Sequence, residues 1–120
     1  MDIVETARMA GAVRRGGERL LLRLFTDAER ADARKGDEAA GLAARFAAKE
    51  AALKALGTGW SGGISWRDVE VVREACGRLS LGLAGRAAEI ARERGVAHTH
   101  LAISEGAGLA GAVVIFEGRA

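Results

Sequence analysis

The sequence predicts a single small α+β domain, and three observations lead to this fold class. Helical patterns fill the stretch from Glu5 to Leu56. Two strand-like runs, 66–73 and 79–83, follow and are joined around a turn glycine, which predicts a β-hairpin. Two further apolar runs, 101–104 and 110–116, close the chain, and the second is apolar enough for a central strand.

Caps and glycine stops define the individual elements. Thr26 is expected to begin a helix as its N-cap, because Glu29 stands three residues further on and completes a capping box. Gly57 ends the main helix as a C-terminal stop. The polar residues 32–41 are expected to form a loop or a frayed helix. In chain order we expect a short strand ending at 3–4, helices over 5–15, 18–24, from 27 onward and 42–56, the hairpin strands, a helix over 84–94 and the two closing strands.

Length and composition exclude several classes of function. At 120 residues, without a linker or repeat, the chain is expected to form one domain over residues 1–120. No apolar run approaches the ~20 residues of a membrane span and no signal pattern is present, so we expect no membrane partner. A net charge of +2 and the absence of tyrosine give no support for a nucleic-acid partner. The single cysteine favours a reducing compartment, and we expect a cytoplasmic location.

The main helix carries its charged residues between two apolar faces. At 100° per residue its bulky side chains fall on one side and its alanines on the other, so both faces are expected to be covered. The charged side chains would then be partly desolvated, and a partly buried carboxylate needs a cation or a metal ion. Glu50 is therefore a candidate metal ligand. The alternative is an ordinary i,i+4 pair between Glu50 and Lys54, worth about 0.3 kcal/mol.

Two other segments each have a structural and a functional interpretation. Residues 57–63, GTGWSGG, form either a flexible connection or a loop whose backbone N–H groups approach phosphate oxygens without a Cβ in the way. Residues 8–24 carry five arginines against the single carboxylate of Glu18. This segment is either a solvated helix face or a docking surface for an acidic protein.

Three stretches also match a known family in order. Residues 2–5, DIVE, are followed by Arg8, and residues 45–59 read RFAAKEAALKALGTG. Residues 63–71 read GISWRDVEV. Together they resemble the holo-acyl-carrier-protein synthases, the small single-domain class of 4′-phosphopantetheinyl transferases. The second stretch matches that family's motif R-[FW]-A-A-K-E-A-x-x-K-A-L-G-T-G at every fixed position.

The resemblance implies a fold, a reaction and a set of roles. The fold is a curved, mostly antiparallel sheet packed on a central helix, usually assembled as a homotrimer. The reaction moves the phosphopantetheine arm of coenzyme A to a serine of apo-acyl carrier protein, in fatty acid or polyketide synthesis. Mg²⁺ would be held by Asp2 and Glu50, with Glu50 and Lys54 as catalytic residues, and the base is left open between Glu50 and a water. The other implied contacts are coenzyme A binding by Arg45, Lys54, Gly57, Gly59 and Ser61, and carrier-protein binding by Arg8 and Arg15.

The chain departs from the family pattern at three places. Residues 77–79, GRL, stand where the family has G-K-P, which keeps the turn glycine and a cation but loses the proline. Met1 directly precedes Asp2, so the first strand is expected to be short. Glu105 stands where the family places an active-site histidine, and it should weaken coenzyme A binding unless it points away or helps to bind metal. Two alternatives to the enzyme follow: a catalytically impaired relative that keeps the fold and carrier-protein docking, and an arginine-rich binding module.

Overall fold

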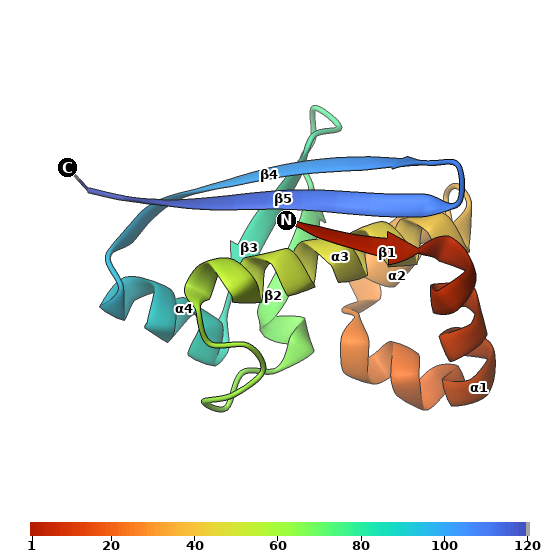
Figure 1. Ribbon diagram of the computed structural model, residues 1–120, viewed down its shortest axis with the longest axis horizontal. Helices are drawn as coiled ribbons and strands as arrows, with labels where there is room; N and C mark the ends of the chain where they lie inside the picture. The colour runs from red at the N-terminus through yellow and green to blue at the C-terminus, as the bar shows by residue number, and fades with distance from the viewer. Residues whose placement is uncertain (120) are drawn as a thin grey trace.

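A long central helix, α3, runs beneath an extended pair of strands, β4 and β5, and the other elements pack around it (Figure 1). The structure is a computed structural model and describes residues 1–119. The elements in chain order are β1 (Asp2–Glu5), α1 (Thr6–Leu24), α2 (Asp27–Ala33), α3 (Glu38–Leu56), the 3₁₀ helix η1 (Trp66–Asp68), β2 (Val69–Arg73), β3 (Leu79–Leu83), α4 (Gly85–Glu93), β4 (Val96–Gly106) and β5 (Leu109–Gly118).

The strands form two antiparallel sheets. β5 lies between β1 and β4, as its apolar sequence predicts, and Asp2 pairs with Ala112 in the register of β1 and β5. The hairpin of β2 and β3 forms the second sheet, again as predicted. β1 is only four residues long, and its pairing with β5 holds the amino-terminal residues beside α3.

Three predicted boundaries are wrong. The main helix begins at Glu38 and not at about Leu42, because Asp37 accepts a hydrogen bond from the backbone N–H of Ala40 and acts as the N-cap. Residues 66–68 form η1 and not a strand, since Ser65 and Asp68 make a capping box. The strand expected over 101–104 extends over the whole of β4.

Helix α1 consists of two helical stretches that meet at a sharp bend at Gly17, as the glycine stop at residues 16–17 predicts. Gly17 has φ 59° and ψ −149°, a backbone conformation that residues with a Cβ rarely adopt. The second half of α1 therefore turns away from the first, as the red and orange ribbon shows (Figure 1). Arg30 of α2 fixes this second half through two hydrogen bonds to the Glu18 carboxylate, at 2.7 and 2.9 Å.

Both faces of α3 are covered within one chain. Its amino-terminal half packs in a cluster with α1 and α2, and its carboxyl-terminal half packs against the sheets and α4. Arg45 and Lys49 are consequently buried, as predicted, and Glu50 is half-buried. Lys54 is exposed, with 59% of its side chain accessible, so the predicted desolvation does not reach this residue.

A buried ion pair joins four of these elements. Lys49 of α3 lies 2.8 Å from Glu29 of α2, and both side chains are fully inaccessible. Lys49 also donates to the carbonyl oxygens of Trp66 and Val69, while Glu29 accepts from the N–H groups of Thr26 and Val71. Burial lowers the pKa of Lys49, and the neighbouring Glu29 opposes this shift. The pair therefore connects α2, α3, η1 and β2 at a single point.

Removing one charge of this pair should destabilise the fold severely. In Glu29→Gln, Lys49 stays buried without its counter-charge, and we expect a loss of about 3–5 kcal/mol in the free energy of unfolding. Urea denaturation followed by circular dichroism measures the loss. Glu89→Gln is the matched control, because Glu89 pairs with Arg86 on the exposed surface of α4, where such pairs contribute about 0–1 kcal/mol. Equal losses in the two variants would contradict the assigned role.

Candidate active site

A hollow of about 780 Å³ opens between β1, α1, α3 and η1; we call it the main hollow. Its charged lining includes Asp2, Glu50 and Lys54, and both halves of the bent α1 contribute to its walls. The aromatic rings of Phe46 and Trp66 form part of its lining and are stacked with their centroids 5.0 Å apart. Glu5, Arg8 and Arg23 also line it, so it is a partly apolar cavity with three acidic and three basic side chains, a composition that suits a ligand site.

Asp2 and Lys54 are in direct contact in this hollow. The pairing of β1 with β5 fixes Asp2 opposite the last turns of α3, and Lys54 Nζ donates to Asp2 Oδ1 at 2.7 Å. This hydrogen bond raises the pKa of Lys54 above its ordinary value, so the ammonium stays charged. The i,i+4 pair with Glu50 is not formed; Glu50 contributes only a longer-range attraction to Lys54. Residues 52 positions apart in the chain thus meet at one wall of the hollow.

Asp2 and Glu50 are suited to a magnesium ion. Mg²⁺ is commonly bound by one or two carboxylates, with waters and substrate phosphates completing its six positions. Asp2 and Glu50, together with Glu5, line one hollow with open volume in front of them, so the two carboxylates that this requirement needs are present. Within residues 1–119, no group of three or more His, Cys, Asp or Glu side chains is close enough to hold a metal by itself. Glu105 therefore does not join Asp2 and Glu50 as a third ligand.

Arg45 does not line the main hollow, although it belongs to the same helix as Glu50 and Lys54. Its guanidinium donates to the carbonyl of Gly41 and to the carboxylate of Asp32. It lines a second hollow of about 330 Å³ together with Lys35, Arg73 and Glu105. Glu105 thus faces these cations and not the main hollow.

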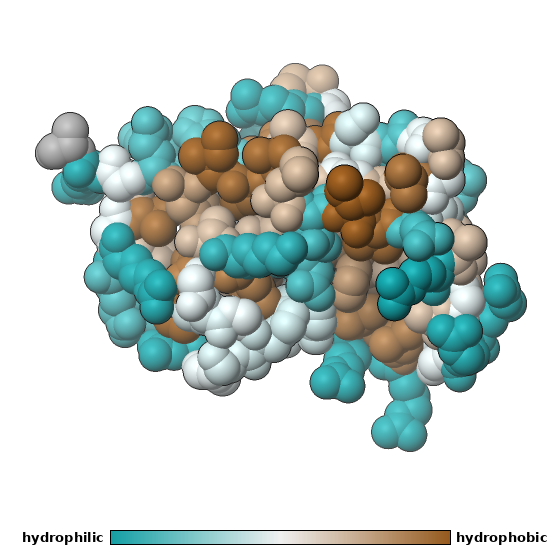
Figure 2. All heavy atoms as spheres, viewed as in Figure 1, coloured by the Kyte–Doolittle hydropathy of each residue, from teal (hydrophilic) through white to brown (hydrophobic). Residues whose placement is uncertain are grey.

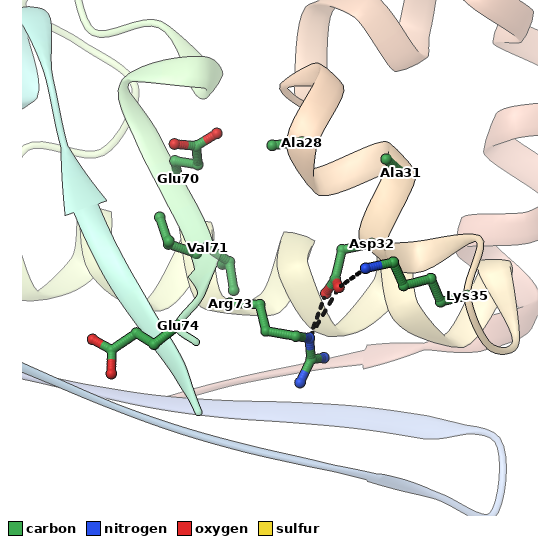
Figure 3. A pocket seen from close by; sticks show the side chains of 9 residues that line it. Ala28, Ala31, Asp32, Lys35, Glu70, Val71, Arg73 and Glu74 are labelled. Carbon is green, nitrogen blue, oxygen red and sulfur yellow. Dashed lines mark hydrogen bonds and ion pairs between the residues drawn. The ribbon is translucent and has the colours of Figure 1, made fainter. Parts of the chain in front are cut away.

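Asp32 is the centre of a cation cluster that the sequence did not reveal. Its carboxylate accepts hydrogen bonds from Arg73 Nε at 2.9 and 3.0 Å and lies 3.9 Å from Lys35 (Figure 3). The hydrogen bond from Arg73, with the nearby Arg45, holds the pKa of Asp32 below its ordinary value. The hollow around this cluster is lined by three cations, Lys35, Arg45 and Arg73, and by three carboxylates, Asp32, Asp37 and Glu105, so its formal charges balance. Asp32 lies in α2 and Arg73 in β2, and no sequence pattern indicates that they meet.

The glycine loop, residues 57–63, connects α3 to the second sheet. Gly57 and Gly59 both have positive φ, at 78° and 59°. The N–H of Gly57 caps α3 by donating to the carbonyls of Leu53 and Lys54, whereas open space surrounds the position of a Cβ at Gly59, so a ligand can approach the backbone there. Ser61 Oγ donates to the carbonyl of Thr58 at 2.6 Å, which closes the loop internally. The predicted contacts Gly57, Gly59 and Ser61 are all exposed and available to a ligand.

The predicted docking arginines lie on α1, and the structure separates them. Arg8 lines the main hollow, whereas Arg15 does not. Both are exposed, and neither forms an ion pair with any of the described residues 1–119. Arg23, from the second half of α1, also lines the main hollow. The basic segment therefore borders the hollow along both halves of the bent helix.

Comparison with known proteins assigns this arrangement to a family. The family model described as the 4′-phosphopantetheinyl transferase superfamily matches residues 1–114. The chain belongs to this superfamily. Among curated proteins it is similar to the holo-[acyl-carrier-protein] synthase of Koribacter versatilis, with 46% identity over 98% of this chain and 94% of the other. It is also similar to that of Clavibacter michiganensis, with 49% identity over 100% and 94% of the two chains.

Solved structures confirm the predicted fold class. The Helicobacter pylori holo-[acyl-carrier-protein] synthase, solved in complex with coenzyme A, is similar with a TM-score of 0.85 and 28% identity over 97% of this chain and 96% of that one. The Neisseria meningitidis enzyme gives a TM-score of 0.87 and 30% identity over 97% and 94%. The chain is thus a transferase of the 4′-phosphopantetheinyl transferase superfamily, and the prediction of an arginine-rich binding module without enzymatic activity is not supported. No helix in residues 1–119 has the length and apolar character needed to cross a membrane.

Proposed function

We propose that this protein transfers the 4′-phosphopantetheine group of coenzyme A to a serine of apo-acyl carrier protein, using Mg²⁺. The observation that supports this most directly is the convergence of Asp2, Glu50 and Lys54 in the main hollow. This is the acid, acid and cation set that a metal-bound diphosphate requires. We further propose that the protein acts in the cytoplasm and serves fatty acid or polyketide synthesis.

Each residue of the set has a distinct task. Asp2 and Glu50 would hold Mg²⁺, which when bound offsets the negative charge that develops on the diphosphate. Lys54 would place a positive charge beside the leaving group, and the hydrogen bond to Asp2, which raises the pKa of Lys54, fixes its position there. The attacking hydroxyl belongs to the carrier protein, so no nucleophile is required from this chain. Glu50, which is half-buried on the wall of the hollow, is the candidate base that this chain itself supplies.

Coenzyme A would extend from the main hollow to the glycine loop and the Asp32 cluster. The exposed backbone at Gly59, with Ser61 and the neighbouring Gly57, would accommodate phosphate oxygens without a Cβ in the way. Arg45, with Lys35 and Arg73, would donate hydrogen bonds to a further phosphate in the second hollow. Glu105 lines the same hollow, so its carboxylate would oppose a phosphate there.

The carrier protein would approach along α1. Arg8 borders the main hollow and Arg15 is exposed on the same helix, so acidic side chains of the partner would meet unpaired cations. The bend at Gly17 directs the second half of α1, with Arg23, to another side of the same hollow. The serine of a carrier protein bound along α1 would then lie beside the main hollow, where Asp2 and Glu50 would hold the metal ion.

Transfer of phosphopantetheine can be tested by weighing the carrier protein. Incubated with apo-acyl carrier protein, Mg²⁺ and coenzyme A, this protein should increase the carrier mass by one phosphopantetheine group, as measured by mass spectrometry. Glu50→Ala should lower the rate by at least about 100-fold, because it removes a metal ligand and the candidate base. Glu89→Ala, a surface carboxylate on α4, should leave the rate unchanged. No mass gain with the native chain would contradict the proposed function, and full activity of Glu50→Ala would contradict the metal site.

We also propose that the protein assembles as a homotrimer through the outer face of its three-stranded sheet. Ile3, Leu109, Val113 and Ile115 are exposed on β1 and β5, with 40–60% of each residue accessible. Figure 2 shows the corresponding apolar surface over these two strands. Exposed apolar patches of this kind mark association surfaces. The two covered faces of α3 need no second copy, because the chain covers them itself.

A charge placed on this face should break the assembly. Val113→Glu is expected to shift the mass measured by light scattering after size exclusion from that of three chains to that of one, since a carboxylate would be buried in the interface. Val72→Glu, on an exposed strand of the other sheet, is the matched control and should leave the trimer intact. A native chain that already elutes as a monomer would contradict the proposal.

A further inference from the structure

The glycine loop contains one large side chain, Trp60, and its ring is directed back onto the domain. Gly57, Gly59 and Ser61 are exposed, whereas Trp60 is half-buried against the apolar core. Its ring lies against that of Trp66, with 34° between the two planes. Trp60 is therefore the loop's main side-chain attachment to the domain.

Trp66 is itself rigidly held. Its carbonyl oxygen accepts a hydrogen bond from Lys49 Nζ at 3.0 Å, which links it to the buried Lys49–Glu29 pair. Its ring stacks on Phe46, one helical turn before Glu50 on α3. The rings of Phe46, Trp66 and Trp60, which we call the aromatic stack, thus form a continuous contact from the wall of the main hollow to the glycine loop.

The backbone of the loop offers little restraint of its own. Gly59, Gly62 and Gly63 all have positive φ, and glycines in such segments have wide conformational freedom in the absence of other contacts. The other attachments are a hydrogen bond from Arg86 Nε to the carbonyl of Gly62 at 3.1 Å and the internal bond of Ser61. The Arg86 bond restrains the second half of the loop, whereas the Ser61 bond joins the loop only to itself. Gly57 is held as the C-cap of α3, because its N–H donates to the carbonyls of Leu53 and Lys54, but no hydrogen bond among the described residues 1–119 ties Gly59 to another element.

Trp60 is held by its ring and not by its indole N–H. Nε1 is inaccessible to solvent and has no hydrogen-bond partner among the described residues 1–119. A buried donor without an acceptor is unfavourable, so this group does not favour the observed position. The stacking and burial of the ring must outweigh that cost, since aromatic pairs contribute beyond their buried area.

We propose that Trp60 is a positioning residue: through the aromatic stack it holds the glycine loop in the conformation that receives the diphosphate of coenzyme A. This inference rests on the proposed function of the loop. Preorganising a loop lowers the entropy lost when a ligand binds, so Trp60 acts on coenzyme A affinity more than on the chemical step.

Trp60→Ala, compared with Trp60→Phe, tests this role. Trp60→Ala should raise KM for coenzyme A by about 10-fold with kcat changed less than about 2-fold, because only the restraint on the loop is lost. Trp60→Phe keeps a stacking ring and removes the unpaired N–H, so its KM should remain within about 2-fold of the native value. KM for the carrier protein should be unchanged in both variants. Trp60→Leu, an apolar side chain that cannot stack, should behave as Trp60→Ala does and replaces it if that variant fails to fold.

Amide hydrogen exchange in the free protein gives a second measurement that does not depend on transfer. Residues 57–63 should exchange faster in Trp60→Ala or Trp60→Leu than in Trp60→Phe, while residues of α3 remain unchanged. An active native chain with unchanged KM or unchanged loop exchange in Trp60→Ala would overturn this inference alone. A native chain without transfer would overturn the proposed function, and with it the role of the loop.

Discussion

The buried pair of Lys49 and Glu29 is the constraint on which the rest of this structure depends. Neither charge has access to water, so each must be satisfied by partners that the fold brings from elsewhere. Those partners are backbone groups of Trp66, Val69 and Val71, together with the capping box of α2. The pair is satisfied only when α2, α3, η1 and β2 occupy their native positions. The pair therefore favours this one arrangement of the four elements more than it adds to the net free energy of unfolding.

The functional side chains follow from this arrangement. Trp66, whose carbonyl Lys49 holds, lines the main hollow and supports the glycine loop through Trp60. On the other border of α3, Glu50 and Lys54 face the strand that carries Asp2. One helix thus uses adjacent residues for two purposes: Lys49 organises the interior and Glu50 is available to a ligand. The bend at Gly17 adds the remaining wall by directing both halves of α1 around the hollow.

Much of this fold is predictable from the sequence, and the exceptions have identifiable causes. Local signals such as the Thr26 capping box, the Gly57 stop and the apolar run of β5 predict their elements correctly, since each depends on nearby residues. Apolar periodicity does not predict the start of α3 at Glu38, because Asp37 caps the helix within a polar stretch that has no such periodicity. The Asp32 cluster and the aromatic stack depend on contacts across more than one element, which no local pattern encodes. The proposed metal ligands, Asp2 and Glu50, follow from a motif resemblance, whereas the Asp2–Lys54 contact depends on the pairing of β1 with β5.

The central claim is that Asp2 and Glu50 form one metal site in the main hollow, and crystallography with manganese tests it most directly. Mn²⁺ suits carboxylate and water ligands as Mg²⁺ does, and its anomalous scattering identifies its position without ambiguity. In crystals of the native chain grown with coenzyme A and Mn²⁺, we expect an anomalous peak in coordination contact with carboxylate oxygens of both Asp2 and Glu50. A structure with coenzyme A bound and the metal held by other residues, or with no metal between these two carboxylates, would contradict the account.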